Sequence, residues 1–123
     1  MRIIPTRVHG VMDYLMGAVL IIAPWLLRFR PDPESWVPIA VGAGALVYSL
    51  LTRYELGVYG LIPMPVHLGL DAVSGLFLLA SPWLFGFADH VWVPHVVLGV
   101  AELGAALMTH TVPESAPRGS LAA

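Results

Sequence analysis

The stretch IPTRVHGVMDYLMGAVLIIAPWLLRF, residues 4–29, returns 58 positions later as IPMPVHLGLDAVSGLFLLASPWLFGF, residues 62–87. The Ile-Pro, Val-His, Asp, Gly, Leu and Pro-Trp-Leu positions coincide in the two copies. A Trp-Val-Pro triplet follows each copy, at residues 36–38 and 92–94. Repeated units must bury their faces against one another, so an internal repeat constrains the architecture before local propensity does. We therefore read the chain as two tandem units, residues 4–53 and 62–110.

The composition is far more apolar than that of a soluble globular domain. The 123 residues are 58% hydrophobic and 11% charged, with a mean hydropathy of +0.80. About 20 apolar residues are needed to cross roughly 30 Å of hydrocarbon, and four segments approach this length: residues 7–27, 36–53, 65–85 and 91–110. We expect the first segment to be retained rather than cleaved as a signal, because Asp13 interrupts it and its pattern recurs internally.

Each unit is predicted to be a helical hairpin. Its first helix begins after Pro5 or Pro63, because proline suits a position that needs no intrahelical donor. That helix nears its end at Pro24 or Pro82, and the second helix begins at the Trp-Val-Pro triplet with proline in its first turn. The predicted fold is all-α, with four transmembrane helices in one domain, residues 1–110, and a disordered tail, residues 111–123. An even number of crossings per unit predicts a pseudo-two-fold axis along the membrane normal.

All the tryptophans fall at the two expected hairpin tips: Trp25, Trp36, Trp83 and Trp92. Tryptophan favours the headgroup level of a bilayer, so we expect these residues to act as interfacial anchors on one side of the membrane.

Arginines set the expected orientation. Arg2, Arg7, Arg53 and Arg118 belong to the terminal side, whereas Arg28 and Arg30 belong to the first tip. The positive-inside bias then predicts a multi-pass protein of the inner (cytoplasmic) membrane with both termini in the cytoplasm.

The residues most able to carry chemistry are two His/Asp pairs within the apolar segments. His9 and Asp13 are four residues apart, as are His67 and Asp71, so each pair shares one helix face. An aspartate inside the hydrocarbon costs roughly 2.5–3.5 kcal/mol, so both should face protein. One turn deeper, Gly17 and Gly75 would let another backbone approach, and we expect the first and third helices to pack through these faces.

Glu102 is a further candidate because it lies near the middle of the last apolar segment, where the first unit has Leu46. Desolvation disfavours a buried carboxylate, so a neutral, hydrogen-bonded glutamate is one interpretation. Proton handling or a subunit contact is the other.

Several functions remain open at this point. The His and Asp side chains could form a polar clasp between helices, a site for Zn, Fe or Mn, a proton or ion path, or a pair of haem ligands from His9 and His67. We favour a non-enzymatic scaffold or accessory subunit without a cofactor. The alternatives are a small transporter or proton- or metal-handling protein that uses these residues and Glu102, and then an enzyme acting on a membrane-soluble substrate.

The partners expected for the chain follow from the same observations. The lipid bilayer is the first partner, and small-residue stretches at residues 42–45 and 104–106 suit packing within a homo-oligomer or a larger membrane complex. No phosphate-binding loop or basic nucleic-acid patch is present, so nucleic acid is not expected. With no cysteine, the chain has no disulfide, thiolate ligand or catalytic thiol.

Ser81-Pro82-Trp83, which follows His67, Asp71 and Gly75, resembles the motif of the SPW repeat family of small membrane proteins. That motif lies at the end of the first of two transmembrane helices. The first unit departs from it, with Ala23 in place of serine. The resemblance covers about residues 5–110 and implies paired helical hairpins, but it implies no activity and no catalytic residues.

Overall fold

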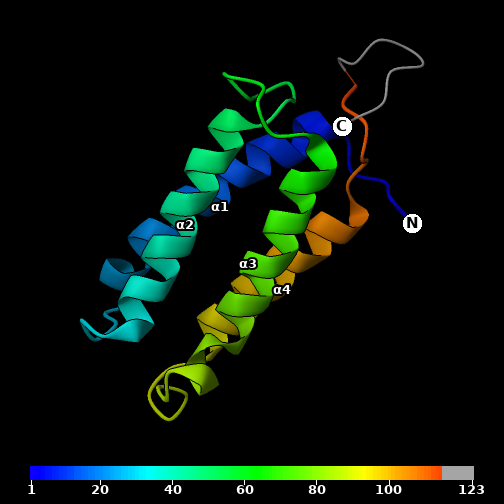
Figure 1. Ribbon diagram of the computed structural model, residues 1–123. Helices are drawn as coiled ribbons and strands as arrows, with labels where there is room; N and C mark the ends of the chain where they lie inside the picture. The colour runs from blue at the N-terminus through cyan, green and yellow to red at the C-terminus, as the bar shows by residue number, and fades with distance from the viewer. Residues whose placement is uncertain (115–123) are drawn as a thin grey trace.

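The computed structural model describes residues 1–114, which form four helices: α1 (Thr6–Leu26), α2 (Pro33–Leu51), α3 (Met64–Leu84) and α4 (Val93–Met108). The all-helical prediction is confirmed for this part of the chain. In Figure 1 the two hairpin tips lie at one end of the bundle, and the start of α1 and the end of α4 lie together at the other. Most of the tail that we expected to be disordered, residues 115–123, lies outside the described residues.

Proline starts the first helix of each hairpin, as the sequence predicts. Pro5 and Pro63 both adopt extended backbone angles, and each carbonyl accepts the first helical hydrogen bond, from His9 N–H and His67 N–H respectively at 3.0 Å. The ends of these helices also match. Pro24 O and Pro82 O accept backbone bonds from Phe29 and Phe87 at 2.9 and 2.8 Å.

The start of α2 departs from the prediction, whereas the start of α4 agrees with it. α2 begins at Pro33, with Asp32 as its N-cap, so Pro38 lies beyond the first turn. α4 begins only at Val93, and Pro94 does lie in its first turn. The longer first loop carries its own proline, which supplies the helix-starting position that we had given to the Trp-Val-Pro triplet.

Glycine contacts join the helices within each hairpin. A Cβ added at Gly17 would lie 3.2 Å from Gly42 O of α2, and one added at Gly75 would lie 3.0 Å from Gly99 O of α4. The close approach that we expected at Gly17 and Gly75 is therefore made to the neighbouring helix of the same hairpin, rather than between α1 and α3. Small residues allow such contacts because no side chain separates the two backbones.

The main helix contact between the hairpins joins α2 to α3. An apolar cluster lies between the hairpins, and its buried members are Leu20 of α1, Val37 and Val41 of α2, and Leu78 of α3. Leu20 and Leu78 hold matching positions in the two units. Each hairpin thus contributes to one shared core.

Membrane character is evident in helix length and surface. α1, α2 and α3 are long and apolar enough to cross a bilayer, whereas α4 has 16 residues and is shorter than a span normally requires. Large apolar side chains are exposed along the outside of the bundle. The four tryptophans at the tips are among them: Trp25, Trp36, Trp83 and Trp92. These features are consistent with a multi-pass membrane protein.

Candidate functional site

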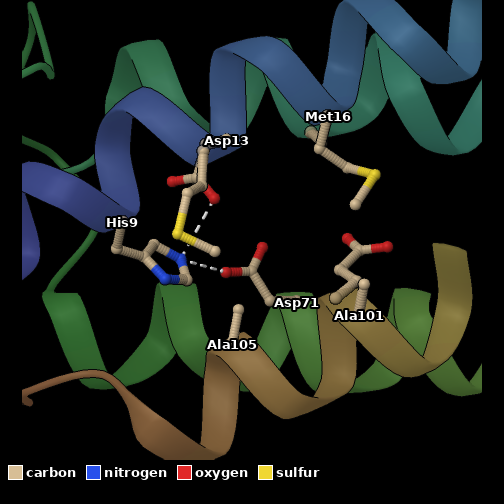
Figure 2. Close-up of a pocket in the computed structure, with 9 residues that line it drawn as sticks. His9, Asp13, Met16, Asp71, Ala101 and Ala105 are labelled. Carbon is tan, nitrogen blue, oxygen red and sulfur yellow. Dashed lines mark hydrogen bonds and ion pairs between the residues drawn. The ribbon is translucent and has the colours of Figure 1, made fainter. Parts of the chain in front are cut away.

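The two predicted His/Asp pairs meet in one buried cluster between α1 and α3. His9 Nε2 lies 2.7 Å from Asp71 Oδ2 and 3.0 Å from Asp13 Oδ1. His67 Nε2 lies 3.0 Å from Asp13 Oδ2 and 3.2 Å from Asp71 Oδ2. The Nε2 atom of each imidazole therefore faces one carboxylate of its own helix and one carboxylate of the other hairpin. None of the four residues is more than 8% exposed. Figure 2 shows His9, Asp13 and Asp71 converging from two helices. We call these four residues the His/Asp cluster.

The outer nitrogen of each imidazole contacts a threonine of the other hairpin. Thr109 Oγ1 lies 2.7 Å from His9 Nδ1, and Thr52 Oγ1 lies 2.7 Å from His67 Nδ1. Each threonine also donates its one hydroxyl hydrogen to a backbone carbonyl in the last turn of its own helix, at 2.6 Å. The hydroxyl must therefore accept from the ring, so both Nδ1 atoms carry hydrogen. In a neutral ring the lone pair is then on Nε2, pointing into the cluster.

Two tyrosines complete the surroundings of the carboxylates. Tyr48 OH of α2 donates a short hydrogen bond to Asp71 Oδ1. Tyr54 OH, from the segment between the hairpins, donates to Asp13 Oδ2 at 2.7 Å. Burial, together with the charge of Asp13, raises the pKa of the Tyr54 hydroxyl, which keeps it protonated and able to donate. Each aspartate thus accepts one tyrosine hydroxyl bond from a different segment.

His67 Nε2 is the one nitrogen of the His/Asp cluster that makes no hydrogen bond to a described residue. It lies at ion-pair distance from both carboxylates, at 3.0 and 3.2 Å, but makes no hydrogen bond of standard geometry with either. By contrast, His9 Nε2 makes a hydrogen bond with Asp71 Oδ2. A fully buried polar atom without a partner is uncommon in native proteins. It lies here at the centre of the candidate site.

Glu102 of α4 lies beside the cluster rather than in it. Its Oε1 accepts a hydrogen bond from Ser74 Oγ at 2.7 Å, and its buried Oε2 has no hydrogen-bond partner among the described residues. Glu102 also lines a cavity of about 50 Å³ that reaches His9, Asp13 and Asp71. Figure 2 shows this cavity, with Met16 of α1 on one side and Ala101 and Ala105 of α4 on the other.

The contacts made by matching residues of α2 and α4 show which position of the first unit corresponds to Glu102. Gly42 and Gly99 make matching contacts, and so do Thr52 and Thr109, although each pair is 57 positions apart. The Trp-Val-Pro triplets are 56 apart. Glu102 therefore corresponds to Ala45, which lines the same cavity, and not to Leu46 as the triplets suggested.

A second polar contact joins the hairpins at their tips. Glu34 is buried at the start of α2, and its Oε2 lies 2.8 Å from His90 Nδ1 of the second tip. The backbone carbonyl of Glu34 accepts from His95 Nε2 of α4 at 2.9 Å. Glu34 was not among the residues predicted to form polar contacts. Its position 56 residues before His90 in the repeat was the one signal that could have indicated this pairing.

The geometry narrows the chemistry available to the cluster. A haem between His9 and His67 does not fit this arrangement, because carboxylate oxygens of Asp13 and Asp71 lie within 3.2 Å of both Nε2 atoms, where the iron and porphyrin would have to be. Their ligand atoms and those of Asp13 and Asp71 all lie within 4.8 Å of one another, which a single cation could bridge. A network of ion pairs is the other arrangement that these atoms support.

A family model described as the SPW repeat domain matches residues 7–109. The chain belongs to the SPW repeat family. The resemblance drawn from Ser81-Pro82-Trp83 is thus confirmed. In this SPW repeat protein Ser81 Oγ donates to Leu78 O at 2.7 Å within α3, a bond that Ala23 cannot make in α1. No curated protein and no solved structure matches the chain.

Proposed function

We propose that this SPW repeat protein is a scaffold or accessory subunit of the cytoplasmic membrane, whose two hairpins are fastened by the His/Asp cluster acting as a polar clasp. The observation that carries the proposal is the crossing of contacts. His9 of the first hairpin reaches Asp71 of the second, and His67 of the second reaches Asp13 of the first. Such crossed contacts fix the register of one hairpin against the other.

The clasp is important because the hydrophobic effect does not drive helices to associate within lipid. Packing and interhelical hydrogen bonds then decide which helices meet, with about 0.6–2 kcal/mol for each bond. The glycine contacts serve each hairpin by itself. Between the hairpins, α2 packs on α3, and the His/Asp cluster adds the link from α1 to α3. The clasp would therefore determine how the hairpins assemble.

We further propose that the hairpins are related by a pseudo-two-fold axis along the membrane normal. The matching bonds of His9 with Thr109 and of His67 with Thr52 support this relation. It requires α4 to cross the bilayer although it rises only about 24 Å at 1.5 Å per residue. Local thinning of the bilayer and the flanking Trp92 would accommodate the difference.

The orientation proposed from the arginines places the termini in the cytoplasm, and cysteine labelling tests it cleanly because the chain has no cysteine. Single cysteines at Arg2 and Val58 should react with an impermeant reagent from one side of the membrane. Cysteines at Asp32 and Asp89 should react from the other. Reaction of Val58→Cys and Asp32→Cys from the same side would contradict four crossings.

Paired spin labels test the clasp in the full chain. Labels at Arg7→Cys of α1 and Val66→Cys of α3 report the separation of the hairpins, and labels at Arg7→Cys and Leu50→Cys of α2 report the first hairpin alone. We expect Asp71→Ala to broaden the first distance distribution and to leave the second narrow. An unchanged first distribution would reject the clasp. If both broaden because the chain unfolds, Asp71→Asn provides the milder test.

Proton or metal handling is the second candidate, and the unpartnered Oε2 of Glu102 favours it. Glu102 lines the same small cavity as His9, Asp13 and Asp71, so a cation could pass between them. Proteoliposomes with a trapped pH- or metal-sensitive dye would separate the candidates. Flux through the wild-type chain that Glu102→Gln abolishes would favour handling, whereas no flux with an intact clasp would favour the scaffold.

A further inference from the structure

We propose that His9, Asp13, His67 and Asp71 bind one divalent transition-metal ion. Zn²⁺ suits this set of ligands and is the ion used in the test below. The inference rests on the clasp geometry proposed above and adds a ligand to it. Each residue offers one ligand atom, and these four atoms lie within 4.8 Å of one another. Two come from α1 and two from α3, so the ion would tie the hairpins together at the point where the side chains already converge.

The donor set fits such an ion. Two imidazole nitrogens with two carboxylate oxygens suit Zn²⁺, Fe²⁺ or Mn²⁺, whereas Mg²⁺ and Ca²⁺ favour oxygen ligands. Ligands bound to zinc at about 2.0–2.2 Å lie about 3.4 Å apart in a tetrahedral site. The four contacts between His nitrogens and Asp oxygens measure 2.7–3.2 Å. Because all four ligand atoms lie within 4.8 Å of one another, small adjustments of the side chains would admit the ion.

The threonines give both imidazoles the correct tautomer for this role. Because Thr52 and Thr109 accept from Nδ1–H, the lone pair of each neutral ring is on Nε2 and points at the carboxylates. A lone pair facing two carboxylates is repelled by them unless positive charge lies between. One divalent ion would supply that charge and balance Asp13 and Asp71, whereas in the metal-free chain protonation of the two rings supplies it.

His67 Nε2 makes no hydrogen bond within residues 1–114 although it lies at ion-pair distance from Asp13 and Asp71, and this is an independent observation that points to a ligand. The residue is 0% exposed, its Nδ1 is occupied by Thr52, and no hydrogen bond within the cluster uses its Nε2. A metal ion at the centre would give this nitrogen a partner. No hydrogen bond within the His/Asp cluster gives it one.

Groups outside the four ligands would hold them in place. Metal-bound histidines commonly donate their other N–H to a neighbouring acceptor, and the ligating carboxylates are hydrogen-bonded in turn. Thr52 and Thr109 take the first role, and Tyr48 and Tyr54 take the second. The cavity beside His9 and Asp71 reaches the ligands and could hold water near the ion.

The test is zinc binding by the full chain in lipid nanodiscs. The protein is stripped with a chelator, dialysed against a range of free Zn²⁺ concentrations and analysed for metal by mass spectrometry. We expect one Zn²⁺ per chain at saturation. His67→Gln and Asp71→Asn should each weaken binding at least tenfold. His95→Gln is the matched control, since His95 is equally buried but lies at the hairpin tips.

Threonine variants cover the case in which loss of a ligand prevents folding. Thr52→Val and Thr109→Val keep all four ligands, so each should still reach one Zn²⁺ per chain, with roughly 10–100-fold weaker binding. Wild-type protein that takes up less than one Zn²⁺, or His67→Gln that binds as tightly as His95→Gln, would overturn the proposal.

The spin-label distances of the metal-free chain keep the two proposals separable. If Asp71→Ala broadens the distance between Arg7→Cys and Val66→Cys but the wild type binds no Zn²⁺, the metal site is rejected and the clasp remains. If neither effect occurs, both proposals are rejected.

Discussion

The two hairpins contribute matching groups to the His/Asp cluster but surround them with different ones. Each supplies a histidine, an aspartate and a threonine that contacts the histidine of the other hairpin. Only the first unit and the segment after it supply tyrosines, Tyr48 and Tyr54, and only the second supplies Glu102. The matching groups make the link between the hairpins. The unmatched ones decide how the two carboxylates differ.

We expect the largest loss of unfolding free energy when an aspartate of the His/Asp cluster is removed, because both hairpins share this cluster. Asp13→Ala and Asp71→Ala each remove one of the two carboxylates that both imidazoles contact, and breaking a buried ion pair in this way typically costs about 3–5 kcal/mol. We expect similar losses of unfolding free energy for the two variants, measured by chemical unfolding in detergent micelles. A loss at one position and none at the other would show that the hairpins do not share the cluster equally.

The tyrosines allow the surroundings of the two aspartates to be compared, because each tyrosine donates a hydrogen bond to only one aspartate. Tyr48→Phe and Tyr54→Phe remove one hydrogen bond to Asp71 and Asp13 respectively. A bond to a charged group is worth about 1.5–3 kcal/mol, so each change should lower the unfolding free energy by that amount. Tyr59→Phe is the control, since Tyr59 is 68% exposed and should cost almost nothing. Equal effects of all three changes would deny the tyrosines a role in the cluster.

Glycine contacts should tolerate substitution equally poorly in both hairpins. A Cβ at Gly42 would lie 2.7 Å from Gly17 O, and one at Gly99 would lie 2.7 Å from Gly75 O. Gly42→Ala and Gly99→Ala should each cost about 1–3 kcal/mol in melting experiments, because the backbones must move apart. Gly44→Ala and Gly104→Ala meet no atom within 4 Å and serve as matched controls. Controls as damaging as the test variants would contradict the packing.

The smallest difference lies after the first helix of each hairpin. Arg28 and Gly86 hold matching positions with φ of 55° and 74°, a left-handed conformation that costs a residue with a side chain about 1 kcal/mol. Arg28→Gly should therefore raise the melting temperature slightly, and Gly86→Arg should lower it. Opposite signs would indicate that the Arg28 side chain compensates for its backbone.

Much of the fold could be predicted because it follows from the repeat. Pro5 and Pro63 mark helix starts through local geometry alone, and spacing of four places His9 with Asp13 on one face. The structure adds that these faces meet across the hairpins. Sequence could not show that Gly17 packs on α2, because helix spacing identifies a face but not the helix opposite.

The missed residues are those whose partners lie far along the chain. Thr52 and Thr109 contact histidines 15 and 100 positions away. Their equivalence was hidden because the second helices match at a spacing of 57 from Gly42 and Gly99 onward but at 56 at the Trp-Val-Pro triplets. Tyr48 and Tyr54 have no counterpart that acts in the second unit, so the repeat gave no signal for them.

A double-mutant cycle tests most directly whether the His/Asp cluster is one network. Asp13→Ala, Asp71→Ala and the double variant are compared by their unfolding free energies in the metal-free chain. Residues in one network show coupling of about 0.5–3 kcal/mol, so the double variant should lose less than the two single losses together. Asp71→Ala combined with Glu34→Ala at the distant tips should instead be additive within about 0.5 kcal/mol. Additive losses for Asp13 and Asp71 would contradict the shared cluster and leave two separate His/Asp pairs.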